Sequence, residues 1–117
     1  MGAARFDLVI EQGATFDKTF VWKDASRIAK DLTTYTAAMQ IRETIEASDT
    51  IASSTGTSPN ITITLGGALG TIQIVIAASV TALFTFDVAV YDLELITGSV
   101  VKRMLEGEVK LKKEVTR

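Results

Sequence analysis

The sequence predicts an all-β protein: an antiparallel β-sandwich of about seven strands, with Greek-key or jelly-roll-like connections and at most one short helical turn. Three observations lead to this prediction. The β-branched residues Thr, Ile and Val, which pack well on a pleated surface, supply 37 of the 117 residues. Apolar and polar residues alternate in most segments. Turn signals recur roughly every 8 to 12 residues. A small open barrel is the alternative architecture.

The N-terminal part of the chain contains three segments with this alternation. They are residues 5–13, 15–24 and 32–43. The second of them places Phe16, Phe20 and Trp22 on one face of a strand, and the third places Met39 and Ile41 on one face. Such spacing is typical of side chains that pack on a core, so these faces are expected to form one.

The C-terminal part predicts two hairpins separated by a short helical turn. Residues 61–65 and 72–76 alternate in the same way around a turn from Gly66 to Gly70. Residues 77–86 carry a short apolar helical turn. Beyond it two long strands are expected to meet at a tight turn at Gly98, and Gly107 is expected to form a β-bulge in the second of them.

The whole chain, 1–117, is predicted to be one domain with two unusual segments. Residues 44–60 hold eight Ser or Thr together with Gly56 and the only proline, which predicts a flexible loop that a partner could order. Residues 102–117 form a basic strand and tail, with six basic and three acidic side chains. Residues 1–101 carry six basic and eleven acidic ones, so the tail extends from an acidic body.

Composition argues against an enzyme. The chain has no His and no Cys, which removes the commonest general base, the thiol nucleophile and the soft metal ligands. The glycine-rich turn at 66–70 is followed by a strand, whereas a phosphate-binding loop needs a following helix N-terminus or a Lys. We therefore predict no catalytic residues, no cofactor and no metal ligand set.

One acidic cluster invites a second interpretation. Four carboxylates are spaced to project from one face of the last two strands: Asp92, Glu94, Glu106 and Glu108. Such a group could bind Ca²⁺ through its oxygens. The favoured interpretation is an exposed face that is neutralised by Lys102, Lys110 and Lys112 in cross-strand pairs.

The C-terminal segment is the candidate partner-binding region. The residues assigned to it are Lys110, Lys112, Lys113, Val115 and Arg117. In one interpretation they form a docking arm for an acidic partner, offered by an exposed edge strand. In the other, the segment is an edge strand whose lysines prevent aggregation. Neither membrane contact nor direct nucleic-acid binding is expected, because no segment is long and apolar enough to span a bilayer and the aromatic residues lack interleaved basic ones.

Four blocks, which together cover nearly the whole chain, carry a resemblance. They are FDLVIEQGATFDKTFVWKD, DLTTYTAAMQIRE, ITLGGALGTIQIVI and YDLELITGSVVKRMLEGEVKLKKEVTR. In this order they resemble a family of small virion proteins of tailed bacteriophages, and the second block is similar to the N-terminal β-sandwich of phage baseplate upper proteins. The segment ASRIAK and the loop at 44–60 depart from that family.

The resemblance implies a virion structural protein that is made in the host cytoplasm. It would assemble in several copies with other virion proteins, as a tail or baseplate module that adapts fibres. A head-associated protein, either a capsid decoration protein or a neck component, is the first alternative. A small carbohydrate-binding sandwich with Trp22 at its site is the second.

Overall fold

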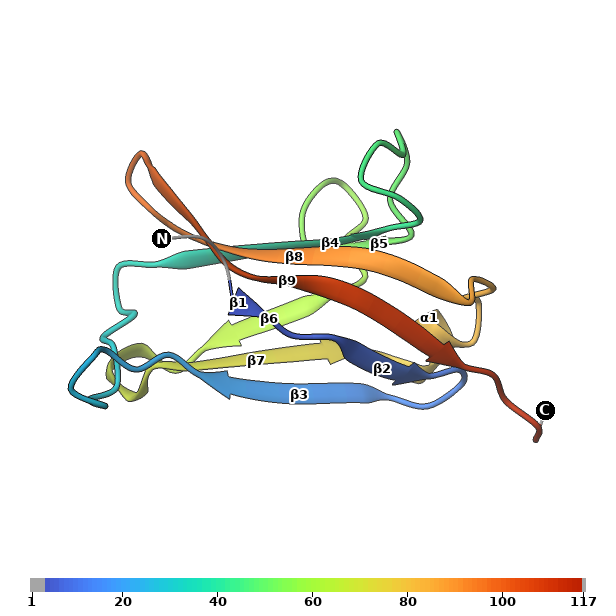
Figure 1. The fold of residues 1–117 in the computed structure, drawn as a ribbon, viewed down its shortest axis with the longest axis horizontal. Coiled ribbons are helices and arrows are strands. Elements are labelled where there is room, and N and C mark those ends of the chain that lie inside the picture. Colours follow the sequence, from blue (N-terminus) through green and yellow to red (C-terminus); the bar gives the residue numbers. More distant parts are fainter. Residues whose placement is uncertain (1–3, 117) are drawn as a thin grey trace.

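The computed structural model describes residues 4–116 as two β-sheets packed face to face (Figure 1). The strands are β1 (Ala4–Arg5), β2 (Leu8–Glu11), β3 (Phe16–Val21), β4 (Thr36–Arg42), β5 (Ala52–Ser53), β6 (Thr62–Leu65), β7 (Thr71–Ile76), β8 (Val88–Thr97) and β9 (Val100–Lys112). The helical elements are a 3₁₀ turn, η1 (Gly67–Leu69), and a single α-helical turn, α1 (Ala78–Thr81). The predicted all-β sandwich is confirmed. No helix in the described part of the chain is long and apolar enough to cross a bilayer.

The larger sheet has the strand order β1–β9–β8–β4–β5, and β2 also pairs with β9. The smaller sheet has the order β3–β7–β6. Two pairings differ from the antiparallel prediction, because β1 and β2 both run parallel to β9. Alternation has the same period in parallel and antiparallel strands, so it could not reveal this direction.

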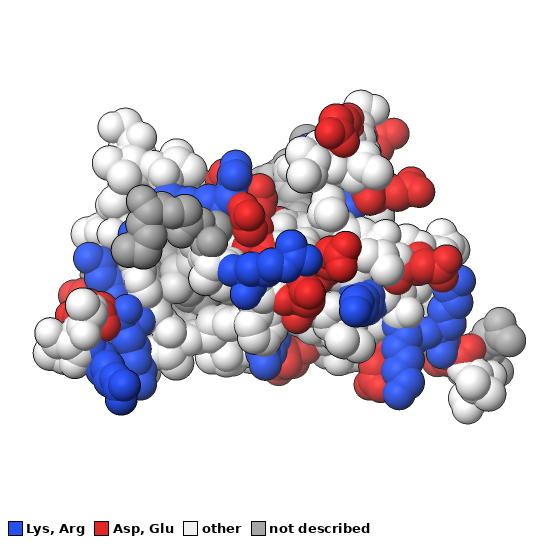
Figure 2. Space-filling view, in the orientation of Figure 1, with Lys and Arg blue, Asp and Glu red and all other residues white. Residues whose placement is uncertain are grey.

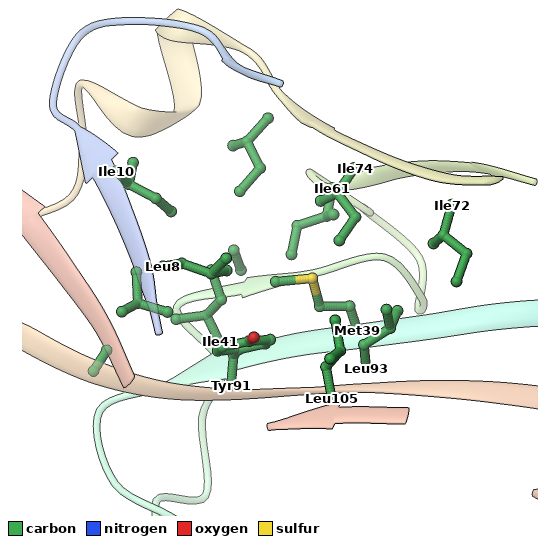
Figure 3. Close-up of a cluster of buried hydrophobic side chains, with 14 of the residues drawn as sticks. Leu8, Ile10, Met39, Ile41, Ile61, Ile72, Ile74, Tyr91, Leu93 and Leu105 are labelled. Carbon is green, nitrogen blue, oxygen red and sulfur yellow. The ribbon is translucent and has the colours of Figure 1, made fainter. Parts of the chain in front are cut away.

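The core fills the space between the two sheets (Figure 3). The fully buried side chains come from both layers: Ile10 and Val109, Met39 and Ile41, Ile72, Ile74 and Ile76, and Leu93 and Leu95. The predicted inward faces of residues 32–43 and 72–76 are therefore confirmed. Truncating one of these side chains to Ala costs about 2–5 kcal/mol in a typical core, so this layer fixes the positions of the surfaces described below.

Both predicted hairpins are present. β6 and β7 join through η1, where Gly67 and Gly70 adopt positive φ values of 58° and 68°. β8 and β9 join at Gly98, with φ of 58°. The predicted helical turn is α1, and its buried Thr81 donates a 2.8 Å hydrogen bond to the carbonyl of Ala14. That bond ties α1 to the turn between β2 and β3.

The β-bulge lies elsewhere than predicted. The register of β8 against β9 shifts between Leu93 and Glu94, which pair with Leu105 and Arg103, so Met104 is the extra residue. Gly107 pairs regularly with Tyr91. A glycine in a strand marks either a bulge or a close approach of another backbone, and here the second explanation holds.

Candidate interaction surfaces

The N-terminal strand is joined to β9 at Gly107. A Cβ atom at this position would lie 2.5 Å from the carbonyl oxygen of Phe6 and 2.8 Å from Oδ1 of Asp7. The Phe6 amide donates to the carbonyl of Glu106 at 3.0 Å, and the amide of Glu108 donates to Oδ1 of Asp7 at 2.9 Å. Gly107 therefore makes room for the segment between β1 and β2 to approach β9.

Tyr91 completes this junction. Its ring is buried, and its hydroxyl donates a hydrogen bond to the carbonyl of Phe6. Burial raises the pKa of Tyr91 to about 12; the negative charge of Asp7 acts in the same direction and the positive charge of Arg5 opposes it. The hydroxyl is therefore protonated, and a donor, over the whole physiological range.

The outer side of the larger sheet is a charged face, made by Arg5, Asp7, Asp92, Glu94, Arg103, Glu106 and Glu108. The predicted acidic cluster is brought together here, since Asp92 pairs with Glu106 across β8 and β9 and Glu108 lies next in the row. The predicted neutralising partners are wrong, however. Two arginines, and not the lysines, carry the compensating charge.

Arg103 lies among three carboxylates of this charged face. Its side-chain nitrogens are 3.4 Å from Asp92, 4.0 Å from Glu94 and 3.9 Å from Glu106. Nη2 of Arg5 likewise lies between two carboxylates, 3.2 Å from Oδ1 of Asp7 and 3.9 Å from Oε1 of Glu108. Within residues 4–116, no group of three or more acidic side chains is arranged to hold a metal ion.

A hollow of about 360 Å³ opens on the charged face, partly roofed by the chain that follows β4. It is lined by Arg5, Gln40, Arg42, Ile45, Val90, Tyr91, Asp92, Arg103, Glu106, Gly107 and Glu108. Arg42 donates to the carbonyl of Ala47 and to Oε1 of Gln40, both at 2.8 Å. Most of the charged groups around this hollow are thus already engaged with one another.

The aromatic face predicted for residues 15–24 packs against the core, with each ring only partly buried. Trp22 meets Tyr35 edge-on, with ring centroids 5.9 Å apart. The ammonium groups of Lys30 and Lys102 lie 5.5 Å and 5.1 Å from the centroid of the indole. Two lysine ammonium groups therefore already lie close to the ring on which a saccharide would stack.

A second hollow, of about 340 Å³, lies at the end of the sandwich where α1 faces the chain around β5. We call it the apolar groove; it is lined by Glu43, Ile51, Asn60, Val80, Leu83, Phe84, Thr85 and Phe86. Phe84 is buried, whereas Leu83 is 79% exposed. Sequence reasoning placed both residues in one apolar helical turn and missed the groove, because part of its lining, Glu43, Ile51 and Asn60, comes from a distant part of the chain.

An acidic loop, residues 43–50, rises beside this groove. It carries Glu43, Glu46 and Asp49, and the chain has no Lys or Arg from residue 43 to residue 101. None of the three carboxylates forms an ion pair with a cation in residues 4–116. Figure 2 shows acidic side chains gathered over the projecting loop at the upper right. Apart from Glu43, the acidic loop belongs to the 44–60 segment, whose predicted flexibility stays a prediction.

The candidate partner-binding residues lie at the same end of the molecule, at the lower right of Figures 1 and 2, where β9 ends. Lys110, Lys112 and Lys113 form what we call the lysine cluster, and all three are exposed. Val115 is 92% exposed. Arg117 lies outside the described residues.

The expectation that this segment is an edge strand is wrong. β9 has β8 on one side and β1 and β2 on the other, so the backbone of Lys110 and its neighbours is already paired. The tail beyond β9 is anchored as well: the ammonium of Lys113 lies 2.9 Å from Asp87, and the amide of Glu114 donates to Oε1 of Gln12 at 2.9 Å. Any docking here would thus use side chains and the last residues, not strand addition along β9.

Comparison with known proteins adds no relative: no protein-family model matches the chain, and no curated protein sequence matches it.

Proposed function

We propose that this chain is a non-enzymatic assembly module, a protein that works by binding other proteins. More particularly, we propose that it is a virion structural protein of a tailed bacteriophage, acting as a tail or baseplate module that adapts fibres. The first statement draws on the surfaces of the sandwich. The second draws on the sequence blocks that resemble small phage virion proteins, and it awaits its own test.

One observation carries the assembly role. One end of the sandwich, which we call the open end, carries the apolar groove, the acidic loop and the lysine cluster. In Figure 1 the loop after β4 projects at the upper right of this end and β9 ends at its lower right. An exposed apolar patch rimmed by polar residues is typical of a protein-binding surface. The charged face offers a contrast, because its arginines and carboxylates neutralise one another.

The arrangement favours a protein partner over a saccharide. Trp22 is the residue that a carbohydrate site would use, and two lysine side chains already lie within about 6 Å of its ring, where cation–π attraction holds them. The groove beside Leu83 has no comparable cover. A rigid scaffold with one open end is what an adaptor between larger components needs.

The test is immunogold electron microscopy of phage particles that encode this chain, with antibody raised against the purified protein. Gold at the distal tail is the expected result. Gold on the shell or at the neck would replace the tail assignment by a head-associated one, and absence of gold from every particle would contradict a virion role.

A truncated chain gives the matching functional test. We expect deletion of residues 114–117 to leave folding intact and to reduce incorporation into particles, because it removes Val115 and the end of the tail. Removing the exposed Val100 side chain at the opposite turn, by Val100→Ala, is the control and should leave incorporation unchanged. Normal incorporation of the truncated chain would contradict a docking role for the tail.

A further inference from the structure

The apolar groove and the acidic loop form one continuous surface. Glu43 belongs to both, since it lines the groove and begins the loop. Leu83 stands 79% exposed on the α1 side. A partner that fits this surface must bring an apolar side chain for the groove and positive charge for the loop.

The chain itself carries both features, at the end of β9. The lysine cluster supplies three ammonium groups, of which Lys110 and Lys112 make no ion pair with a described residue. Lys113 pairs with Asp87, but that carboxylate is 88% exposed, so the pair is weak and readily exchanged. Val115 follows as an apolar side chain that is 92% exposed.

The tail does not cover the groove of its own copy. Glu114 is held at the turn after β2, where its amide meets Gln12 and its carboxylate lies against Gly13. The exposure of Val115, only one residue further, places it in solvent and not against Leu83. The complementary surfaces are therefore both present in one chain, and no ion pair among the described residues joins the lysine cluster to the acidic loop.

We propose that the lysine cluster and Val115 of one copy dock on the acidic loop and apolar groove of a second copy. This proposal rests on the assembly role proposed above and names the partner as the chain itself. The contact joins two different surfaces, so it is heterologous, and each copy can bind a second copy through its groove or through its tail. A small contact of this kind is weak in isolation and gains strength when many copies are held around a symmetric particle.

Sedimentation equilibrium of the full chain tests the proposal, from about 10 µM to about 1 mM at low salt, a range suited to weak contacts. Wild type is expected to self-associate and to dissociate as salt screens the charges. Leu83→Asp in the groove and Val115→Asp in the tail should each weaken association about tenfold or more. Both positions are exposed, so both variants are expected to fold, which their far-ultraviolet circular dichroism checks.

The decisive measurement is made on a mixture of these two variants. The Val115→Asp copy keeps an intact groove and the Leu83→Asp copy keeps an intact tail, so the mixture should form one-to-one complexes that neither variant forms alone. Leu69→Asp and Val100→Asp are the matched controls. They place the same charge at residues that are 70% and 63% exposed, in η1 and at the start of β9, and both variants should associate like wild type.

Three results would overturn the proposal: a wild-type chain that stays monomeric throughout, variants that associate like wild type, or a mixture that stays monomeric. All are measured on the isolated protein, so they are independent of particle labelling. Gold on particles together with a monomeric chain would reject self-docking and leave the assembly role standing.

Discussion

The charged face and the open end of the sandwich both carry acidic and basic side chains, but the two surfaces differ in how these charges are paired. On the charged face, the side-chain nitrogens of one residue, Arg103, lie within 4.0 Å of carboxylate oxygens from three residues. At the open end, the carboxylates of the acidic loop form no ion pair with a described cation, and Lys110 and Lys112 form none with a described carboxylate. The charges of the charged face are thus neutralised within one chain, whereas those of the open end are available to a second copy.

The physical difference lies in how each surface is held. Apart from Arg5 and Asp7, the residues of the charged face project from β8 and β9, adjacent strands in a fixed register, so opposite charges are placed within reach as the sheet forms. The acidic loop lies outside the paired strands, whereas Lys110 and Lys112 belong to β9 and Lys113 follows its end. Mutation can test this difference. Changes on the charged face should alter the free energy of unfolding, whereas changes at the open end should alter binding to a second copy.

The largest effect is expected from Gly107→Ala, beneath the charged face. The new Cβ would lie 2.5 Å from the Phe6 carbonyl, which is backbone and can move only by displacing the N-terminal strand. We expect the free energy of unfolding to fall by about 2–3 kcal/mol in urea denaturation. Gly56→Ala is the control: its φ of 96° is strained for alanine but its surroundings are open, so about 1 kcal/mol is expected. Equal losses would contradict the role of close approach.

Tyr91→Phe should come next, with a fall of about 1–2 kcal/mol in the free energy of unfolding, because the Phe6 carbonyl would lose its partly buried hydrogen bond. A pH effect goes with it. The folded pKa, about 12, lies above the ordinary value of 10, so the unfolded chain loses this proton first. Wild type should therefore lose roughly 2 kcal/mol of stability between pH 10 and pH 12 that Tyr91→Phe does not lose. Parallel pH profiles of the two proteins would contradict this assignment.

A smaller effect is expected from Arg103→Met. The side chains involved are 32–53% exposed, so each ion pair is weak, but the change leaves three neighbouring carboxylates without their shared cation. We expect a loss of about 1 kcal/mol that shrinks as salt is added. Self-association should not change. A variant that unfolds like wild type yet fails to associate would reverse the roles assigned to the two surfaces.

The smallest change in stability is expected from Lys112→Gln. This exposed side chain has no ion-pair partner among the described residues. The free energy of unfolding, measured by thermal denaturation, should therefore match that of wild type within about 0.5 kcal/mol. Association should weaken, because the lysine cluster loses one of its charges. A clear loss of stability would show that Lys112 serves the chain's own fold.

Much of the fold could be predicted from the sequence, because alternation and turn residues are local signals. The inward placement of Met39 and Ile41 follows from period-two spacing, and the hairpin at Gly98 from its turn residues. The parallel pairing of β2 with β9 could not be predicted, since it joins residues about a hundred positions apart and leaves no local trace. The bulge was misplaced for the same reason: the Phe6 backbone that explains Gly107 comes from the other end of the chain.

The candidate site was predicted only in part. The basic residues at the end of β9 were recognised from charge, which composition reveals directly. Their status as part of a central strand was missed, because strand order is a property of the whole sheet. The apolar groove was missed as well. Its lining combines Ile51 with residues 80–86, which only the folded chain brings together.

The most direct measurement of the central claim is the mass of the wild-type chain by sedimentation equilibrium, at the same protein concentration in low salt and in about 0.5 M salt, where exposed charges are strongly screened. If the open end binds a second copy, the measured mass exceeds that of one chain in low salt and falls toward the single-chain mass in high salt. The Arg103→Met variant should show the same two masses. A single-chain mass under both conditions would contradict the account.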